Sequence, residues 1–490
     1  MNRFSATVLR NSAFGLAAQL AMKVLSFAFN VLVIRQLGAT DFGQYAAVGA
    51  FGTLFLFIAD LGLSPYAVRE FARWRDAPDG AARTQALYAN VLWLRLALAL
   101  VAGLFTLIAA WLTGRPLLMI GAIALNSIGV LLYAVQGTSE AALAGFERLD
   151  VASTARVLNQ LAFVVIGGAA LWLGFGYYGL IVANLLGIAL MLYACWRATR
   201  ALGLRFGPAQ PQLWLSLLRA SLPFGVIGFA LGLSYRYDSV LLNVTRSDQE
   251  TGFYNAAYNL IFSAVVISNV VNTALYPSLT RQNASQPDRL ADITERVLRY
   301  LLLLALPIAV GGWALSGQIV QFLFDREYAA AAPALSVLVW VVPFMYLSEF
   351  LGYVVVILGQ EGRVARAVLV STGLNVALNT LLVPMFGLMA AAAMTVLTEV
   401  VLVGQHAWTL RRLLRQVNWR EALLRPLLAT LAMGGVVLLL APWLPLPANV
   451  ALGALFYGLA ALSLGAVSRE DLSFLRRARR EQVETPQVAP

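Results

Sequence analysis

Three residue types are almost missing from this 490-residue chain, which has one cysteine, one lysine and one histidine. A lone cysteine, Cys195, excludes a disulfide within the chain and a cysteine-cluster metal site. A lone histidine, His406, makes a histidine-based metal site implausible. No Gly-x-x-x-x-Gly-Lys-[Ser/Thr] motif occurs, which argues against ATP as a driving nucleotide. We therefore expect no metal and no cofactor.

Charge is scarce as well, and apolar residues take its place. Charged residues make up 12% of the chain and hydrophobic residues 60%, against about 25% and about 45–50% in typical soluble domains. Mean hydropathy is +0.75. The composition predicts an all-α integral membrane protein, because helices satisfy their own backbone hydrogen bonds in lipid. In a membrane protein, the net charge of +11 is explained by basic residues in the cytoplasmic loops, so we expect no nucleic-acid partner.

Apolar runs separated by charged or Pro/Gly-rich loops predict about fourteen transmembrane helices. Their expected ranges are 12–34, 43–63, 87–111, 117–138, 157–175, 178–195, 221–243, 254–276, 297–316, 334–357, 367–386, 388–407, 424–443 and 447–467. With the first segment placed inside and the others alternating, the inward segments hold 28 basic residues and the outward segments four. This bias predicts a multi-pass protein of the bacterial cytoplasmic membrane with both termini cytoplasmic.

The two halves of the chain resemble each other. Residues 41–47 (DFGQYAA) and 250–256 (ETGFYNA) share an acid, Gly, Tyr and Ala at the same offsets, 209 residues apart. The repeat predicts two six-helix lobes related by a pseudo-two-fold axis along the membrane normal, plus two C-terminal helices. The expected parts are an N-terminal lobe at 1–200, a cytoplasmic amphipathic linker at 201–220, a C-terminal lobe at 221–415, the two added spans at 416–468 and a basic, disordered tail at 469–490.

The only lysine lies in the middle of the first apolar run. Gln19, Lys23, Ser26 and Asn30 follow steps of four, three and four residues, so they share one helix face. An ammonium at mid-membrane costs at least about 2.5–3.5 kcal/mol on insertion scales. This polar face is suited to an anionic headgroup that crosses the membrane. The alternative is that Lys23 pairs with a neighbouring carboxylate.

Several segments resemble a known family. They are residues 35–45 (RQLGATDFGQY), 60–63 (DLGL), 252–258 (GFYNAAY), 328–333 (YAAAAP) and 358–363 (LGQEGR). Together they make the chain similar to the Wzx-type oligosaccharide flippases of the multidrug/oligosaccharidyl-lipid/polysaccharide exporter superfamily. The resemblance implies fourteen helices in two lobes, and a cavity lined by spans 1, 2, 7 and 8. The implied cargo is a polyprenyl-diphosphate-linked oligosaccharide.

Other polar residues in the predicted spans are candidates for the same cavity. Arg236 lies on a face of small and polar residues, and a guanidinium can hold a phosphate with two bonds. Its alternative is to reach out to the outer interface. Asn255 and Asn259 share a face of the eighth span and could bind sugar hydroxyls, or bond to another helix. Arg95 is expected to extend towards the inner interface, and His406 is expected to be interfacial.

Four acids in or near the spans are candidates for proton coupling or charge balance. Asp60 precedes Gly62 at a predicted turn, and Asp238 lies off the Arg236 face. Glu349 and Glu399 lie within the tenth and twelfth spans, where desolvation favours the protonated carboxyl. Each could instead be neutral, hydrogen-bonded filling.

These features predict a transporter that is not an enzyme: a flippase for oligosaccharide repeat units of O-antigen, capsule or exopolysaccharide. Membrane lipid, a polysaccharide polymerase and chain-length machinery are its expected partners, with proton or sodium as a candidate coupling ion. The alternatives are a peptidoglycan-precursor flippase and a multidrug or cation antiporter. A polysaccharide polymerase is disfavoured because the longest outward loop, about residues 317–333, is short.

Overall fold

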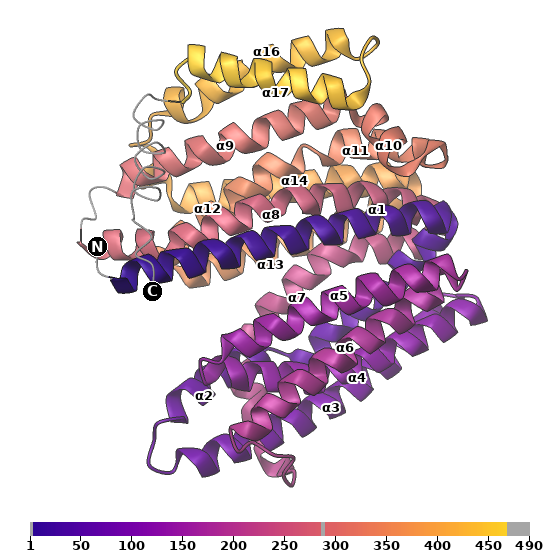
Figure 1. The fold of residues 1–490 in the computed structure, drawn as a ribbon, viewed down its shortest axis with the longest axis vertical. Helices are drawn as coiled ribbons and strands as arrows, with labels where there is room; N and C mark the ends of the chain where they lie inside the picture. Colours follow the sequence, from indigo (N-terminus) through magenta and orange to yellow (C-terminus); the bar gives the residue numbers. More distant parts are fainter. Residues whose placement is uncertain (1–2, 286–289, 468–490) are drawn as a thin grey trace, which may run out of the picture. The chain divides into compact units, whose positions relative to one another are not determined.

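The computed structural model describes residues 3–285 and 290–467, with side chains at 22–269, 271, 272, 279 and 290–467. All the regular structure in these ranges is helical (Figure 1). The helices of the N-terminal half are α1 (Arg3–Asp60), α2 (Leu63–Trp74), α3 (Gly80–Leu112), α4 (Leu117–Gly145), α5 (Leu149–Trp172), α6 (Gly176–Ala201), η1 (Pro211–Leu213), α7 (Trp214–Thr245) and α8 (Asp248–Ser285). Those that follow are α9 (Leu290–Ala314), α10 (Ser316–Phe324), η3 (Arg326–Ala330), α11 (Ala331–Leu338), α12 (Val341–Ile357), α13 (Glu361–Phe386), α14 (Leu388–Thr409), α15 (Arg411–Leu414), η4 (Arg420–Leu424), α16 (Arg425–Leu440) and α17 (Leu446–Ser463).

Many of these helices are long and apolar enough to cross a membrane. Within the described residues there are 11 such helices, or up to 12 if η3–α11 and α12, which meet at 44°, form one broken span. The expected all-α, multi-pass membrane fold is confirmed. The predicted number of fourteen spans stays a prediction.

Two predicted spans are arms of one helix, α1. Gly38, with φ 72° and ψ 174°, interrupts the helix between them. A tight turn then ends the second arm, because Leu61 and Gly62 have φ of 42° and 79°. Glycine takes this left-handed conformation readily since it has no Cβ. Gly38 of the RQLGATDFGQY segment and Gly62 of the DLGL segment therefore mark the two ends of the second arm.

The chain divides into two compact units. The first holds residues up to 256 together with 368–391, and the second holds 257–367 and the residues from 392 on. In the first unit α3, α4, α5 and α6 lie side by side, drawn in purple and magenta in Figure 1. In the second unit α9 packs against α12 and against α16, and α16 pairs with α17. The lobe boundaries expected from the repeat stay a prediction.

The predicted linker at 201–220 is partly helical. Residues 205–210 have no regular structure and are held along α3. Gln85 donates to the Arg205 carbonyl (2.7 Å) and accepts from the Arg205 backbone N–H (2.8 Å), and the Trp93 indole donates to the Gly207 carbonyl (3.0 Å). From Trp214 onwards the segment is the first part of α7. The predicted tail at 469–490 lies outside the described residues.

Candidate functional site

Lys23 lies on the first arm of α1, and its side chain is exposed. In the part of the chain that the structure describes, no carboxylate pairs with its ammonium. Asn30, two helical turns away, is half-buried. Gln19 is helical, but its side chain lies outside those described. Among the described residues, the structure thus provides no acidic partner for Lys23, and both its proposed roles stay predictions.

Arg236 lies on α7 and is half-buried. Its guanidinium also makes no hydrogen bond or ion pair with any residue in the described ranges. Lys23 of α1 and Arg236 of α7 are therefore two cations of the first unit. Neither has a hydrogen-bond or ion-pair partner among the described residues. Both keep donors for an anionic ligand.

Asp238 and Asn255 have local partners where α7 packs on the start of α8. The buried Asp238 carboxylate accepts hydrogen bonds from the Tyr254 hydroxyl and from the Ser239 backbone N–H (2.7 Å). The Ser239 hydroxyl donates to Asn255 Oδ1 (3.1 Å), and Asn255 Nδ2 donates to the Thr251 carbonyl (2.9 Å). These contacts match the structural alternatives for both residues. Asn259, four residues further on, is half-buried in the second unit.

Asp60, which is half-buried, forms an ion pair with the buried Arg95. Arg95 Nη2 lies 3.0 Å from Asp60 Oδ1, and its Nη1 donates to the Ser64 hydroxyl at 3.0 Å. The Ser64 hydroxyl in turn donates to Asp60 (2.6 Å). The Arg95 side chain is 6% exposed and is held by Asp60 and Ser64, and the expectation that it extends towards the inner interface stays a prediction. Asp60 thus balances the charge of Arg95 next to the Leu61–Gly62 turn.

Glu349 and Glu399 belong to one polar cluster in the second unit. Ser268 and Asn272 of α8 donate to Glu349 Oε2 at 2.9 and 3.3 Å. Ser348 of α12 donates to Glu399 Oε2 at 2.8 Å. The donors are all neutral, so a carboxylate here receives only hydrogen bonds as compensation for leaving water. Ser348, which donates to Glu399, directly precedes Glu349 in α12. The two acids therefore lie close to each other in the structure.

His406 is buried next to this cluster, with 3% of its surface exposed. Its ring lies against α12, because a Cβ added at Gly352 would be 3.4 Å from His406 Cε1. His406 lies in the last turn of α14, and its expected position at the membrane interface stays a prediction. Among the described residues, no group of three or more His, Cys, Asp or Glu side chains could hold a metal ion.

A network that sequence reasoning missed lies around Asp248, at the start of α8. Asp248 accepts from Gln44 Nε2 (2.9 Å) and Asn243 Nδ2 (2.7 Å), and the Arg115 guanidinium is 3.9 Å away. Arg115 also donates to the Asn243 carbonyl at 2.7 Å. The network joins α1, α7, α8 and the loop between α3 and α4.

The count of basic residues in inward and outward segments already pointed to this network. Arg115 and Arg246 are two of only four basic residues assigned to outward segments. Arg115 lies beside Asp248, and Arg246 pairs with Glu250 at 3.0 Å. Glu250 also accepts from the backbone N–H of Leu388 (3.1 Å). Exceptions to the positive-inside bias thus point to structural ion pairs.

Comparisons with known proteins add the family. The sequence profile described as "Polysaccharide biosynthesis protein" matches residues 8–282, and the MatE profile matches residues 223–381. A "probable low-salt glycan biosynthesis flippase", Agl15 of Haloferax volcanii, is 23% identical over 186 residues; this alignment covers 38% of the chain and only 39% of that relative. An uncharacterized membrane protein of Methanocaldococcus jannaschii is 21% identical over 413 residues, covering 80% of the chain and 81% of that protein.

Solved structures share the fold. The lipid II flippase MurJ in an inward closed conformation has a TM-score of 0.71 at 12% identity, covering 92% of this chain and 99% of its own. An inward-facing multidrug resistance transporter of the MATE family, in the MOP superfamily, has a TM-score of 0.63 at 15% identity, covering 81% and 95%. At these identities the likeness shows the fold alone. Because the first sequence profile covers more than half of the chain, the protein belongs to the polysaccharide biosynthesis protein family.

Proposed function

We propose that this protein is a flippase, not an enzyme, for polyprenyl-diphosphate-linked oligosaccharides. Its cargo would be the repeat units of O-antigen, capsule or exopolysaccharide, moved from the inner to the outer leaflet of the bacterial cytoplasmic membrane. The family match and the printed name of the Haloferax volcanii relative support this class of cargo. The single observation that carries the proposal is Lys23, an exposed cation without a partner in the described chain, on an apolar helix.

The chemistry of the cargo explains why such a cation would be kept. A diphosphate that enters a low-dielectric site loses hydration, and an ammonium or guanidinium compensates through charge-assisted hydrogen bonds. Lys23 and Arg236 would hold the phosphates, and Gln19 and Asn30 would meet sugar hydroxyls; Asn259, in the second unit, stays a separate candidate for a sugar contact. Asn255 contributes less in this proposal, because its side chain is bonded to Ser239 and Thr251. Alternating access would carry the headgroup across while the polyprenyl tail stays in lipid.

The direction of transport follows from charge. An interior-negative potential contributes about 2.3 kcal/mol per charge per 100 mV to an anion that moves outward. Proton or sodium coupling is therefore an addition to this driving force. We assign any such coupling to Glu349 and Glu399, whose donors in the described chain are neutral. We propose cytoplasmic termini, and the polysaccharide polymerase and chain-length machinery as partners in the pathway.

Two alternatives use the same fold. A peptidoglycan-precursor flippase would differ in its headgroup, and a multidrug antiporter would take cations. The MatE match to residues 223–381 favours keeping the antiporter as the second candidate. An exposed lysine opposes it, because a cationic drug prefers a carboxylate-lined pocket.

The test is export of surface polysaccharide by cells that carry Lys23→Ala, Lys23→Gln or Lys23→Arg in place of the natural chain. We expect the Ala and Gln variants to lose export and the Arg variant to retain it, since charge is the requirement. Val24→Ala is the matched control, because Val24 is 68% exposed beside Lys23 and carries no charge. Protein levels are measured in the same membranes.

One outcome would contradict the role of Lys23 alone, and another would contradict the flippase function itself. Full export by Lys23→Ala at normal protein level would remove Lys23 as a substrate contact while leaving the flippase in place. If cells that lack the whole chain still export polysaccharide and become sensitive to drugs, the result would favour the antiporter function over the flippase function.

A further inference from the structure

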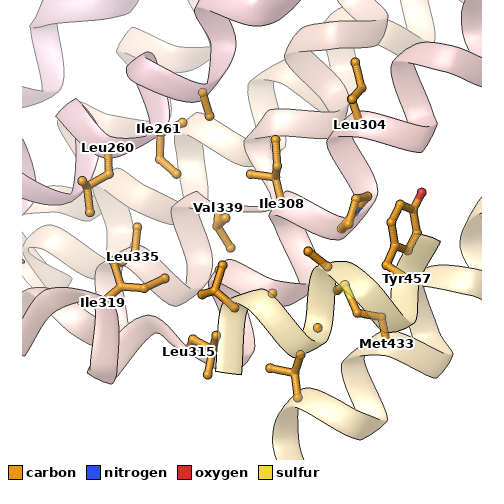
Figure 2. A pocket seen from close by; sticks show the side chains of 18 of the residues that line it. Leu260, Ile261, Leu304, Ile308, Leu315, Ile319, Leu335, Val339, Met433 and Tyr457 are labelled. Carbon is orange, nitrogen blue, oxygen red and sulfur yellow. The ribbon is translucent and has the colours of Figure 1, made fainter. Parts of the chain in front are cut away.

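A strongly basic segment connects two candidate membrane spans of the second unit. Residues 408–420, which we call the basic segment, run from the end of α14 to the start of η4 and hold four arginines and no acid. Leu388–Thr409 and Arg420–Leu440 are both long and apolar enough to cross a membrane. The basic segment therefore belongs where two spans leave the hydrocarbon core. By contrast, the apolar pocket of about 510 Å³ between α9 and the α16–α17 pair has no charged side chain in its lining (Figure 2).

One side of the basic segment is fixed to the protein. Leu410, Leu414 and Val417 follow steps of four and three residues and are all buried. The backbone N–H of Asn418 donates to the Glu295 carboxylate of α9 at 2.7 Å. These contacts hold the backbone of the segment in place, so its opposite side is a defined surface.

The opposite side carries two exposed tryptophans. Trp408 is 71% exposed and Trp419 is 43% exposed. The Arg411 guanidinium lies over the Trp408 ring, 4.9 Å from its centroid. An indole has an apolar body and one N–H donor, which suits the boundary between lipid and water. Tryptophan and arginine are the two residue types that anchor helices at this boundary.

The other three arginines of the segment are also exposed, namely Arg412, Arg415 and Arg420. In the ranges that the structure describes, their guanidiniums make no hydrogen bond or ion pair. Glu421, which follows directly in the sequence, lies 3.6 Å from Arg299 and 3.2 Å from Arg425. The three exposed guanidiniums thus keep all their donors for a ligand.

The charges on the adjacent part of α9 leave the segment positive. Asp292 and Arg296, both exposed, are of opposite sign. Glu295 is the carboxylate that holds the Asn418 backbone. Even when Glu295 is set against the four arginines of the segment, three positive charges remain.

Another segment of the chain shows that topology alone does not require this excess. Residues 69–83, which we call the balanced segment, also hold four arginines, but three acids accompany them. Each arginine lies within 4.0 Å of a carboxylate: Arg69 and Arg73 of Glu70, Arg75 of Asp76, and Arg83 of Asp79. Acids contribute little to the orientation of a membrane protein. Orientation therefore explains the arginines of both segments but not the absence of acids from the basic segment.

We propose that the basic segment binds the phosphates of anionic phospholipids, such as phosphatidylglycerol, at the surface of the membrane. A guanidinium binds phosphate through charge-assisted and often paired hydrogen bonds. A cluster of basic residues directly beside a transmembrane helix attracts anionic lipid. The two indoles lie among the headgroups, and the contact fixes the end of α14 and the start of η4 at the interface. This surface is independent of the cargo and of the flippase proposal.

The test is photocross-linking of the full chain in nanodiscs that contain equal amounts of phosphatidylglycerol and phosphatidylcholine. Gln416→Cys, at an exposed position of the basic segment, receives a thiol-reactive benzophenone, because the only natural cysteine, Cys195, is buried. Mass spectrometry of the cross-linked lipids gives the ratio of the anionic to the zwitterionic lipid. We expect a ratio of at least about five, because one arginine near an anionic surface contributes about five-fold. Ala82→Cys, exposed in the balanced segment, is the matched control and should give a ratio of about one.

Arginine variants of the protein labelled at position 416 test the role of charge. Arg415→Gln should lower the ratio about five-fold. The control is Arg326→Gln, because Arg326 is exposed as well but lies between Asp325 and Glu327, so it should leave the ratio unchanged. High salt should lower the ratio in the unchanged protein, because it screens exposed charges. All these positions are exposed, and size-exclusion chromatography checks that each variant is folded.

Four results would overturn the proposal. Equal cross-linking of the two lipids at position 416 would show that the segment has no preference for negative charge. A preference that survives Arg415→Gln and high salt would show that the arginines do not cause it. Cross-linking to no lipid at all, or to an acidic protein in native membranes, would place the segment away from the bilayer. Displacement of phosphatidylglycerol by an equimolar polyprenyl phosphate would assign the arginines to the lipid carrier of the cargo.

Discussion

Gly43 of α1 and Gly252 of α8 pack backbone against backbone. A Cβ atom added at Gly43 would overlap the carbonyl oxygen of Asp248 and lie 2.9 Å from the Gly252 nitrogen. One added at Gly252 would overlap the carbonyl oxygen of Ala39 and lie 3.2 Å from the Gly43 nitrogen. These glycines hold the same position in the two copies of the repeated motif. Equivalent residues that face each other in this way are what a two-fold axis between the copies requires.

The first prediction concerns this crossing. Gly43→Ala should destabilise the protein by about 1–3 kcal/mol, because the new methyl group overlaps backbone that cannot rotate away. Gly49→Ala in the same helix is the control, since no atom lies within 4 Å of its Cβ position. Thermal unfolding of both variants in detergent, followed by size-exclusion chromatography, measures the difference. Equal melting temperatures would show that the two helices separate without cost.

The second prediction concerns the pair of Asp60 and Arg95. Arg95→Met leaves the Asp60 carboxylate without its cation and should cost less than the loss of a fully buried pair, which is about 3–5 kcal/mol, because this carboxylate is 26% exposed; the double variant with Asp60→Asn should recover part of the loss. A double-mutant cycle in a denaturant titration measures the coupling. The exposed pair Arg83–Asp79, whose side chains are both 54% exposed, is the control and should give about 0.2–1 kcal/mol. A coupling no larger than that of the control would contradict a partly buried ion pair.

The third prediction concerns orientation, and the chain is well suited to it because its only cysteine, Cys195, is buried. In intact cells, a membrane-impermeant maleimide should label Gln249→Cys, in the segment that we place outside. Ala82→Cys, in a segment that we place inside, should react only after permeabilisation. Both positions are exposed in the structure. The reverse pattern would invert the proposed topology.

The fourth prediction concerns coupling. If Glu349 and Glu399 exchange a proton or sodium with the cargo, then Glu349→Gln and Glu399→Gln should make transport in proteoliposomes independent of the pH or sodium gradient. The amide keeps the size and the hydrogen-bonding capacity of the carboxyl group, so folding should be unaffected. Asp76→Asn, whose side chain is 81% exposed, is the control. A gradient response that survives both glutamine variants would remove these acids from coupling.

Helical membrane architecture could be predicted from the sequence, because lipid imposes one pattern on every span. The partners of individual polar residues could not. Arg95 and Asp60 are 35 positions apart and meet only because α1 and α3 pack together. Periodicity along one helix fixes the face of Asp238 but not the presence of Tyr254 opposite it. The burial of Arg95 and His406 could not be predicted for the same reason, since their distance from a span end says nothing of neighbouring helices.

The two breaks at Gly38 and at Leu61–Gly62 set the length of the second arm of α1, which can be compared with the thickness of a bilayer. Between Gly38 and Leu61 the second arm of α1 runs unbroken over residues 39–60, a length of about 33 Å, against a hydrocarbon thickness of about 30 Å. A helix can leave its regular hydrogen bonding only where water or protein takes over. The second arm of α1 is therefore about as long as the hydrocarbon core of a membrane is thick. A thinner bilayer would have to be met by tilt of this arm, at a cost of fractions of a kcal/mol per ångström.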